Sequence, residues 1–261
     1  MSTRKNLKVI IVGSGNVATH LARAIAQSKH ELRQVLSRDL SRAKVLVNNT
    51  NVQAIQSVSH IDPTADVVIL ALKDDVLNTE YINQFPKKII LCHTSGSVSM
   101  DALAAFPNHG IFYPLQTFSK LKEVDFAEIP ICLEASNTEV MQTLSLLASS
   151  LSPLVYEVNS KQRKALHLAA VFACNFTNLM YDISEDLCQK AGMDFEILRP
   201  LIRETAAKAQ EHSPNEVQTG PASRNDKNII NRHINLLNQH VDYQEIYRVL
   251  TDEIIKRNEE L

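Results

Sequence analysis

The sequence predicts an α/β domain with a doubly wound, mainly parallel sheet, followed by an all-helical domain. Three observations carry this prediction. Short runs rich in Val, Ile and Leu alternate with helical patterns up to residue 158, a glycine-rich turn follows the first run, and no convincing strand is found from residue 161 onward. Such alternation is typical of a sheet covered by helices on both faces. We therefore expect two domains, at residues 1–158 and 159–261.

The expected strands are short apolar runs. Such runs suit strands that are buried on both faces, because helices cover each face of a parallel sheet. They occupy residues 8–12, 32–36, 66–72, 88–93, 109–113, 129–133 and 154–158. Helices are predicted between them at residues 16–27, 41–48, 76–84, 100–105 and 138–150.

The last hundred residues are predicted to be helical. Residues 161–191 contain neither Pro nor Gly and predict one long helix, which is apolar on several sides and therefore expected to be buried. Gly192 is a natural stop. Another helix is expected at 194–211, where Pro200 either kinks it or begins a new helix in its first turn. The remaining elements are a polar loop and two helices, at residues 212–225, 226–239 and 243–256.

The composition argues against several kinds of partner. The chain has 261 residues and a formal net charge of -2, whereas general nucleic-acid binding needs a basic face. Its scattered cysteines, Cys92, Cys132, Cys174 and Cys188, favour a reducing compartment over a disulfide framework and show no zinc pattern. No apolar run reaches the length of a membrane span or a signal-peptide core. We expect a cytoplasmic protein that binds no nucleic acid, metal or membrane.

The strand predicted at residues 8–12 leads directly into a glycine-rich turn and a helix. The turn reads Gly13-Ser14-Gly15-Asn16-Val17-Ala18, a G-x-G-x-x-A pattern. Gly13 permits the tight turn, Gly15 lets a pyrophosphate approach the backbone, and Ala18 lets the helix pack against the strand. The phosphates would rest on free N–H groups at the helix N-terminus. In this context the pattern predicts a Rossmann domain that binds a nicotinamide dinucleotide.

The end of the strand predicted at residues 32–36 indicates which dinucleotide binds. Enzymes that use NAD place Asp or Glu about 20 residues past the glycines, but Ser37 and Arg38 follow the strand here. A hydroxyl and a guanidinium suit the 2′-phosphate of NADPH. The alternatives are that Arg38 is a solvated loop charge and that Asp39 binds an NAD ribose, although Asp39 could equally cap the next helix.

Two further strand ends are expected on the nicotinamide side, since ligands of such sheets bind beyond the carboxyl ends of the strands. One carries Leu72 and Lys73, and the other carries Thr94 and Ser95. The predicted cofactor-binding residues are therefore Gly13, Ser14, Gly15, Asn16, Val17, Ser37, Arg38, Leu72, Lys73, Thr94 and Ser95.

Four further segments carry a family resemblance. They are His93-Thr94-Ser95-Gly96-Ser97, Pro114-Leu115-Gln116-Thr117-Phe118, residues 167–175, and residues 219–226 followed by His233. Over nearly its whole length, the chain resembles bacterial proteins that pair a Rossmann-like domain with a helical domain of unknown function, DUF2520. These belong to the 6-phosphogluconate dehydrogenase-like superfamily, with pyrroline-5-carboxylate reductase and F420-dependent NADP reductase. The resemblance implies a Rossmann domain, a helical C-terminal domain and a homodimer, but it supplies no substrate.

The chain departs from the superfamily at one position. The β-hydroxyacid dehydrogenases carry Lys four residues before an Asn on the first helix of the second domain, whereas Val171 stands four residues before Asn175 here. A valine moves no proton. His167 lies one helical turn before Val171, so we name it as the candidate general acid, with Asn175 orienting the substrate. The alternative is a packed histidine with a structural role.

A polar loop at residues 220–226 opens a predicted helix. The guanidinium of Arg224 suits an anionic substrate group, and a comparable segment of pyrroline-5-carboxylate reductases closes on the substrate. Gly220 shapes the loop, and His233 lies two helical turns after Asp226, where it could face the same cleft. The alternative is that Arg224 lies in solvent.

These residues support one leading hypothesis and two alternatives. The leading hypothesis is an NADPH-dependent oxidoreductase for a small, anionic carbonyl or imine substrate, with its site between the domains and its dimer interface in the helical domain. The first alternative is a protein that binds NADP(H) without turnover and acts as a sensor or partner-binding module, because the superfamily lysine is absent. The second is a reductase that uses the deazaflavin F420.

Overall fold

The computed structural model describes residues 6–48, 50–77 and 79–259. By backbone contacts the chain forms two compact units, Met1–Cys174 and Asn175–Leu261. This division falls inside a helical stretch, later than the boundary between residues 158 and 159 that the sequence predicts from the end of the strands. As a boundary between functional domains, the earlier position stays a prediction.

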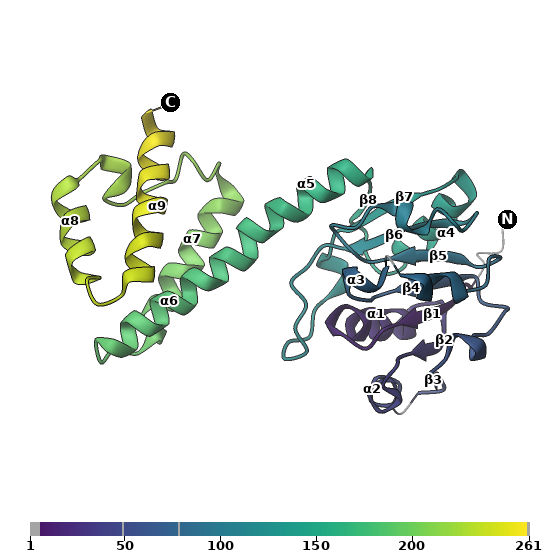
Figure 1. Ribbon diagram of the computed structural model, residues 1–261. Coiled ribbons are helices and arrows are strands. Elements are labelled where there is room, and N and C mark those ends of the chain that lie inside the picture. Colours follow the sequence, from purple (N-terminus) through teal and green to yellow (C-terminus); the bar gives the residue numbers. More distant parts are fainter. Residues whose placement is uncertain (1–5, 49, 78, 260–261) are drawn as a thin grey trace. The chain divides into compact units, whose positions relative to one another are not determined.

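One sheet organises the first unit. Within the described residues it contains eight strands in the order β3-β2-β1-β4-β5-β6-β7-β8 (Figure 1). Neighbouring strands are parallel, except that β7 pairs antiparallel with β6. The strands are β1 Lys8–Val12, β2 Glu31–Leu36, β3 Gln53–Ile55, β4 Val67–Leu70, β5 Ile90–His93, β6 His109–Pro114, β7 Ile131–Ala135 and β8 Val155–Glu157.

This sheet confirms the predicted doubly wound Rossmann fold. Each of the seven expected apolar runs overlaps a strand, and the order reverses between β1 and β4, as in dinucleotide-binding sheets. The short edge strand β3 was not expected, because its three residues include the polar Gln53 and form no apolar run. The antiparallel direction of β7 was not expected either, since an apolar run does not encode strand direction.

Helices cover both faces of the sheet, as the strand β1 illustrates. Its residues alternate between two hydrophobic clusters: Val9 and Ile11 belong to one, Ile10 and Val12 to the other. The first cluster includes buried residues of α1 (Asn16–Gln27) and α4 (Thr138–Ala148). The strand is therefore buried on both sides, which explains why it reads as a continuous apolar run.

Two predicted helices of this unit take a different form. Residues 76–84 contain the end of α3 (Asp74–Leu77) and a 3₁₀ segment, Glu80–Gln84, with residue 78 outside the described residues. Residues 100–105 contain another 3₁₀ segment, Met100–Leu103. Segments this short gain little from helix propagation, so single turns suffice. The other helical elements of the unit are α2 Leu40–Leu46, 3₁₀ turns at Val58–His60 and Phe126–Glu128, and α5 Ser160–Ala170.

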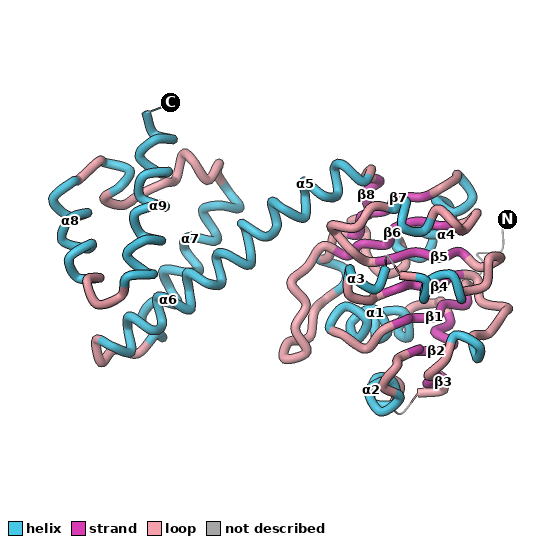
Figure 2. The backbone as a smooth tube through the Cα atoms, in the orientation of Figure 1, coloured by secondary structure: helices cyan, strands magenta, loops and turns pink. Residues whose placement is uncertain are grey.

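The predicted long helix is present, with a change of form in its middle. It consists of α5, a π-helical segment Val171–Phe176, and α6 (Thr177–Lys190), drawn as continuous helix in Figure 2. Asn159 and Gln162 form a capping box at its start. π-helical turns are rare and frequent at functional sites. The Val171 amide still donates to the His167 carbonyl oxygen, so α-helical spacing holds between these two residues. Because a π turn holds more residues than an α turn, that spacing does not hold from Val171 to Asn175.

The second unit continues with helices, as expected. Pro200 lies in the first turn of α7, so it begins a new helix after a 3₁₀ turn and does not kink one. No described helix combines the length and apolar character needed to cross a membrane. The elements after α6 are 3₁₀ Phe195–Leu198, α7 Arg199–Glu211, 3₁₀ Ala222–Arg224, α8 Lys227–Leu236 and α9 Val241–Glu259.

The expected burial of the long helix is not found in the single chain. The exposed fraction is 60% for Leu168, 62% for Phe172 and 47% for Phe176. The prediction that this helix is buried is therefore wrong for these residues in the single chain.

Candidate active site

The glycine turn after β1 has a geometry that only glycine permits at its first position. Gly13 has a φ of +125°, and a Cβ there would lie 2.2 Å from the carbonyl oxygen of Ala71 at the end of β4. Gly15, the N-cap of α1, has no such neighbour: a Cβ would meet nothing within 4 Å. The backbone therefore packs tightly against the sheet at Gly13 and has free space around it at Gly15. There the first N–H groups of α1 have no helical acceptor and could bind an anion.

A cavity of about 460 Å³ lies at the carboxyl ends of β1, β2 and β4. This is the point where the strand order reverses, and ligands of open α/β sheets bind there. Seven of the predicted cofactor-binding residues line it together: Gly13, Ser14, Gly15, Ser37, Arg38, Leu72 and Lys73. Other residues that line it are Asp39, Arg42, Val76, Thr79 and Tyr81.

The residues after β2 present positive charge to this cavity. The hydroxyls of Ser37 and Ser14 lie 3.0 Å apart, and Arg38 is exposed, with no hydrogen bond from its guanidinium to any described residue. Asp39 caps α2 through the amides of Ser41 and Arg42. The Ser41 hydroxyl and these amides hold the pKa of Asp39 below its usual range. Its carboxylate is therefore already engaged as a helix cap, one of the two roles expected for it.

Four other predicted cofactor residues do not line the cavity. The Asn16 side chain donates to the Phe118 carbonyl oxygen at 2.8 Å, and Val17 packs against the hydrophobic core. Thr94 and Ser95 are buried, and the Ser95 hydroxyl accepts hydrogen bonds from the amides of residues 97 and 98. Their contact with a cofactor stays a prediction.

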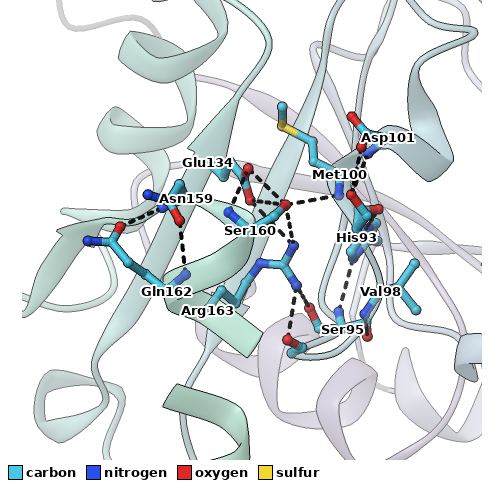
Figure 3. A network of polar contacts seen from close by, with 12 residues as sticks. His93, Ser95, Val98, Met100, Asp101, Glu134, Asn159, Ser160, Gln162 and Arg163 are labelled. Carbon is cyan, nitrogen blue, oxygen red and sulfur yellow. Dashed lines mark hydrogen bonds and ion pairs between the residues drawn. The ribbon is translucent and has the colours of Figure 1, made fainter. Parts of the chain in front are cut away.

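A buried arginine joins the turn after β5 to the start of α5, as Figure 3 shows. Arg163 has no exposed surface. Its Nη1 donates to the carbonyl oxygens of Ser95, at 2.8 Å, and Gly96, at 3.1 Å. Its Nη2 donates to Glu134 Oε2 at 3.3 Å and to Ser160 Oγ at 3.2 Å. Such a buried cation is tolerable only with these partners.

Glu134 links the same network to β7. One carboxylate oxygen accepts from both the amide and the hydroxyl of Ser160, each at 2.9 Å. Since Ser160 begins α5, the carboxylate also favours the N-terminus of that helix. The network therefore fixes the first turn of α5 against β7 and against the turn after β5.

His93, at the end of β5, is held neutral in this environment. Burial lowers its pKa to about 4, and the nearby Arg163 acts in the same direction. Its Nδ1 accepts from the Ser95 amide at 3.2 Å, which leaves Nε2 to donate toward the Ser99 carbonyl oxygen at 3.4 Å. His93 thus shapes the turn, and it stays uncharged at neutral pH.

His167 lies one helical turn after Arg163 and packs on the same turn after β5. A Cβ on Gly96 would come within 2.6 Å of the His167 ring, so only glycine allows this contact. On its other side, His167 Nδ1 lies 3.0 Å from the Tyr113 hydroxyl of β6. Burial raises the pKa of Tyr113 to about 12, which keeps the hydroxyl protonated. His167 is half-buried and has a defined partner for one ring nitrogen.

Sequence reasoning missed Tyr113 and Arg163. The available signal was that Tyr113 directly precedes the segment Pro114–Phe118 that carries the resemblance, and that Arg163 is one turn from His167. Cys92, also on β5, is fully buried, and its burial raises the pKa of the thiol. This agrees with a core residue and argues against a nucleophile.

The other predicted site residues belong to the second unit. Asn175 is exposed in the π-helical segment, and Arg224 is exposed, with no described partner for its guanidinium. Gly220 adopts a φ of +109°, which shapes the loop as expected. His233 Nδ1 lies 2.9 Å from the Tyr247 hydroxyl of α9, so one ring nitrogen has a partner within the unit. Roles of these residues in substrate binding stay predictions. The described residues contain no cluster of three or more His, Cys, Asp or Glu that could hold a metal.

Together, the sheet order, the glycine turn and the cavity at the switch point define a protein of the Rossmann dinucleotide-binding class with a helical C-terminal unit. The sequence matches the family described as NADP oxidoreductase, coenzyme F420-dependent, over residues 8–91. It matches the domain of unknown function DUF2520 over residues 129–254. Among curated proteins, no sequence matches the chain significantly.

Solved structures agree with this combination. A proposed NADP oxidoreductase from Bacteroides fragilis is 38% identical, covers 97% of this chain and 100% of its own, and superposes with a TM-score of 0.90. The chain therefore belongs to this family of Rossmann–DUF2520 proteins, within the 6-phosphogluconate dehydrogenase-like superfamily.

Two more distant structures share the fold. A 1-pyrroline-5-carboxylate reductase from Streptococcus pyogenes has a TM-score of 0.65 at 16% identity, covering 98% of this chain and 99% of its own. A reductive aminase from Aspergillus terreus, in complex with NADPH and ethyl levulinate, has a TM-score of 0.72 at 13% identity, covering 98% and 95%.

Proposed function

We propose that this protein is an NADPH-dependent oxidoreductase that reduces a small, anionic carbonyl or imine compound. The observation that carries the proposal is the cavity at the switch point of the sheet, lined by the glycine turn and by Ser37 and Arg38. Membership of a family that includes a proposed NADP oxidoreductase at 38% identity supports it. So does the shared fold with a reductive aminase that binds NADPH.

The residues after β2 favour NADPH over NADH. Arg38 offers a guanidinium that makes no hydrogen bond or ion pair with any described residue, and Ser37 adds a hydroxyl at the same cavity wall. A 2′-phosphate is an acceptor that suits both groups. The carboxylate that would instead bind a ribose hydroxyl, Asp39, is occupied by the α2 N-terminus and by Arg42, whose Nε lies 3.1 Å away.

His167 is the proposed proton donor. Bound NADPH supplies the hydride, so the protein has to position the substrate and protonate the nascent oxygen or nitrogen. As an imidazolium, His167 would carry a proton on each ring nitrogen. Its Nδ1–H would donate to the Tyr113 hydroxyl oxygen, and its Nε2–H would be the proton given to the substrate, which leaves a neutral imidazole. Arg163 holds the preceding helical turn and so acts as a positioning residue.

The substrate class and the assembly are each proposed from a specific feature of the second unit. An anionic substrate fits the free guanidinium of Arg224, and the fold relatives include a reductase of a cyclic imine carboxylate. A homodimer through the helical unit fits the exposed apolar side chains of that unit, which include Ile197, Leu201 and Leu236. We also retain the cytoplasmic location inferred from the scattered, free cysteines.

Two other functions are favoured by single observations. Val171 stands where related dehydrogenases have lysine, which favours an NADP(H) sensor without turnover. The match of residues 8–91 to F420-dependent oxidoreductases favours the deazaflavin F420 as the second reactant. In both cases the same cavity would bind NADP(H).

The test is NADPH oxidation with a panel of 2-oxo acids, cyclic imino acids and ketone–amine mixtures, with F420 as a separate reactant. We expect turnover by the wild type and a loss of about a hundredfold or more in kcat for His167→Ala, with unchanged NADPH affinity. His60→Ala, at an exposed histidine remote in sequence from the site, is the control. Full activity of His167→Ala would exclude His167 as the acid. Tight NADPH binding with no turnover would favour the sensor, and turnover with F420 alone would favour the deazaflavin.

A further inference from the structure

A loop segment between β6 and β7 lies across the start of α1. We call residues 116–120 the strap; they belong to a stretch without helix or strand, drawn in pink in Figure 2. Three side chains tie it to the glycine turn and α1, about a hundred residues away in sequence. Asn16 Nδ2 donates to the Phe118 carbonyl oxygen at 2.8 Å, His20 Nε2 lies 2.8 Å from the Ser119 carbonyl oxygen, and Lys120 Nζ donates to the Ser14 carbonyl oxygen at 3.1 Å.

The strap is also anchored by packing. The Phe118 ring stacks on Phe126, with centroids 6.0 Å apart, and lies 5.3 Å from the ring of His20. His20 itself is only 4% exposed. These contacts give the strap a fixed position over the helix N-terminus, so the position of Lys120 follows from the fold of the first unit alone.

Lys120 brings an uncompensated positive charge to the glycine turn. An ammonium carries three donors, and the Ser14 carbonyl takes one of them. Lys120 is exposed and forms no ion pair with any described carboxylate; the acidic residue closest to it in the sequence, Glu123, pairs with Arg23. Ser14 and Gly15 both line the cavity. Two donors of the ammonium are therefore available beside the open N-terminus of α1.

We propose that Lys120 binds the pyrophosphate of the dinucleotide and that the strap is part of the cofactor site. The inference rests on the proposed dinucleotide binding and assigns a role to a segment for which the family resemblance supplied none. The free amides at the start of α1 and the Lys120 ammonium meet at one turn, and a phosphate is the acceptor that suits both. Arg38 and Lys120 then divide the recognition: Arg38 the 2′-phosphate, Lys120 the pyrophosphate.

This division gives the two cations different signatures in binding experiments. The pyrophosphate is common to NADPH and NADH, so Lys120→Met should weaken both by a similar factor. One lost hydrogen bond to a charged group corresponds to a factor of about ten or more. Arg38→Met should weaken NADPH alone. Adenosine 2′-monophosphate, which has no 5′-phosphate, should bind Lys120→Met as it binds the wild type.

The experiment is a calorimetric titration of the full-length wild type, Lys120→Met, Lys120→Arg and Lys122→Met with these three ligands. Lys122 is the matched control, since it is an exposed lysine just after the strap with no side-chain contact among the described residues. We expect Lys120→Met to lose affinity for NADPH and NADH and Lys120→Arg to recover part of that affinity. Lys122→Met should bind both dinucleotides like the wild type. If Lys120→Met binds NADPH with the same affinity as Lys122→Met, the inference about Lys120 is overturned and the proposed function is not. Weaker binding of adenosine 2′-monophosphate to Lys120→Met than to the wild type would also overturn the inference. Lys120 would then support the structure of the glycine turn and would not contact the pyrophosphate specifically. A wild type that binds no dinucleotide would overturn the proposed function as well.

Discussion

The two units of the chain differ in how far they bury their own apolar residues. The sheet-bearing unit has two large hydrophobic clusters, in which residues such as Ile11, Leu70 and Phe112 have no exposed surface. In the described part of the helical unit, the buried hydrophobic residues are Ala222, Ile230 and Leu237. Leu201 and Leu236 are 62% and 78% exposed. The first unit thus buries a large core of its own, whereas the described part of the second unit buries few apolar side chains.

This difference shows which parts of the candidate site one unit holds without the other. The cofactor cavity, the Arg163 network and the Tyr113–His167 pair all lie within the first unit. The second unit leaves apolar side chains exposed, and the proposed second copy of the chain would cover them. The following variants test each side of the comparison, in order of expected effect.

Breaking the buried network should have the largest effect. Arg163→Met removes the cation that satisfies Glu134 and two backbone carbonyls, and should lower the free energy of unfolding by about 3–5 kcal/mol. The control is Arg33→Met, whose ion pairs with Glu31 and Asp62 are partly exposed, and which should cost about 1 kcal/mol or less. Urea unfolding measures both. Equal losses in the two variants would contradict the role given to Arg163, and addition of Glu134→Gln should restore part of the stability.

A matched pair of leucines tests the comparison itself. Leu144 of α4 is fully buried, so Leu144→Ala should cost about 2–5 kcal/mol at any protein concentration. Leu201→Ala on α7 should cost little in dilute solution and shift a monomer–dimer equilibrium instead. Sedimentation and urea unfolding over a range of concentrations distinguish the two. A wild type that is monomeric at all concentrations, with a full loss in Leu201→Ala, would show that the helical unit has a core of its own.

Acid should destabilise the sheet-bearing unit through His93. Burial lowers its pKa from 6.5 to about 4, so the folded state binds the proton less tightly than the unfolded state. The stabilising contribution is therefore complete above about pH 6.5 and is lost as the pH falls toward about 4, by about 2–3 kcal/mol. His93→Asn should flatten this part of the pH profile of the unfolding free energy. The same slope in the variant as in the wild type would assign the effect to other groups.

The sequence predicted those features that rest on local patterns. The apolar runs and the glycine turn predicted the sheet and the cavity, because strand burial and the turn geometry at Gly13 depend on residues close together in the sequence. It did not predict contacts between distant segments. Tyr113 meets His167 across 54 positions, and Lys120 meets Ser14 across 106 positions. Neither pair leaves a periodic signal, so only the folded chain shows them.

The π-helical segment illustrates a second limit. Residues 161–191 have the composition of one α-helix, and nothing in their apolar spacing marks the change at Val171–Phe176. The angular relation between His167 and Asn175 was therefore predicted from the wrong helix geometry. The site residues that the first unit holds, such as Gly13 and Arg38, did not depend on that relation.

The central claim is that the sheet-bearing unit carries an NADPH site, and the most direct measurement is a calorimetric titration of the wild type with NADPH and NADH. We predict clearly tighter binding of NADPH, because Ser37 and Arg38 meet the 2′-phosphate while Asp39 caps α2. Tighter binding of NADH would contradict this account and make Asp39 the ribose contact, and binding of neither would leave the fold without the proposed function.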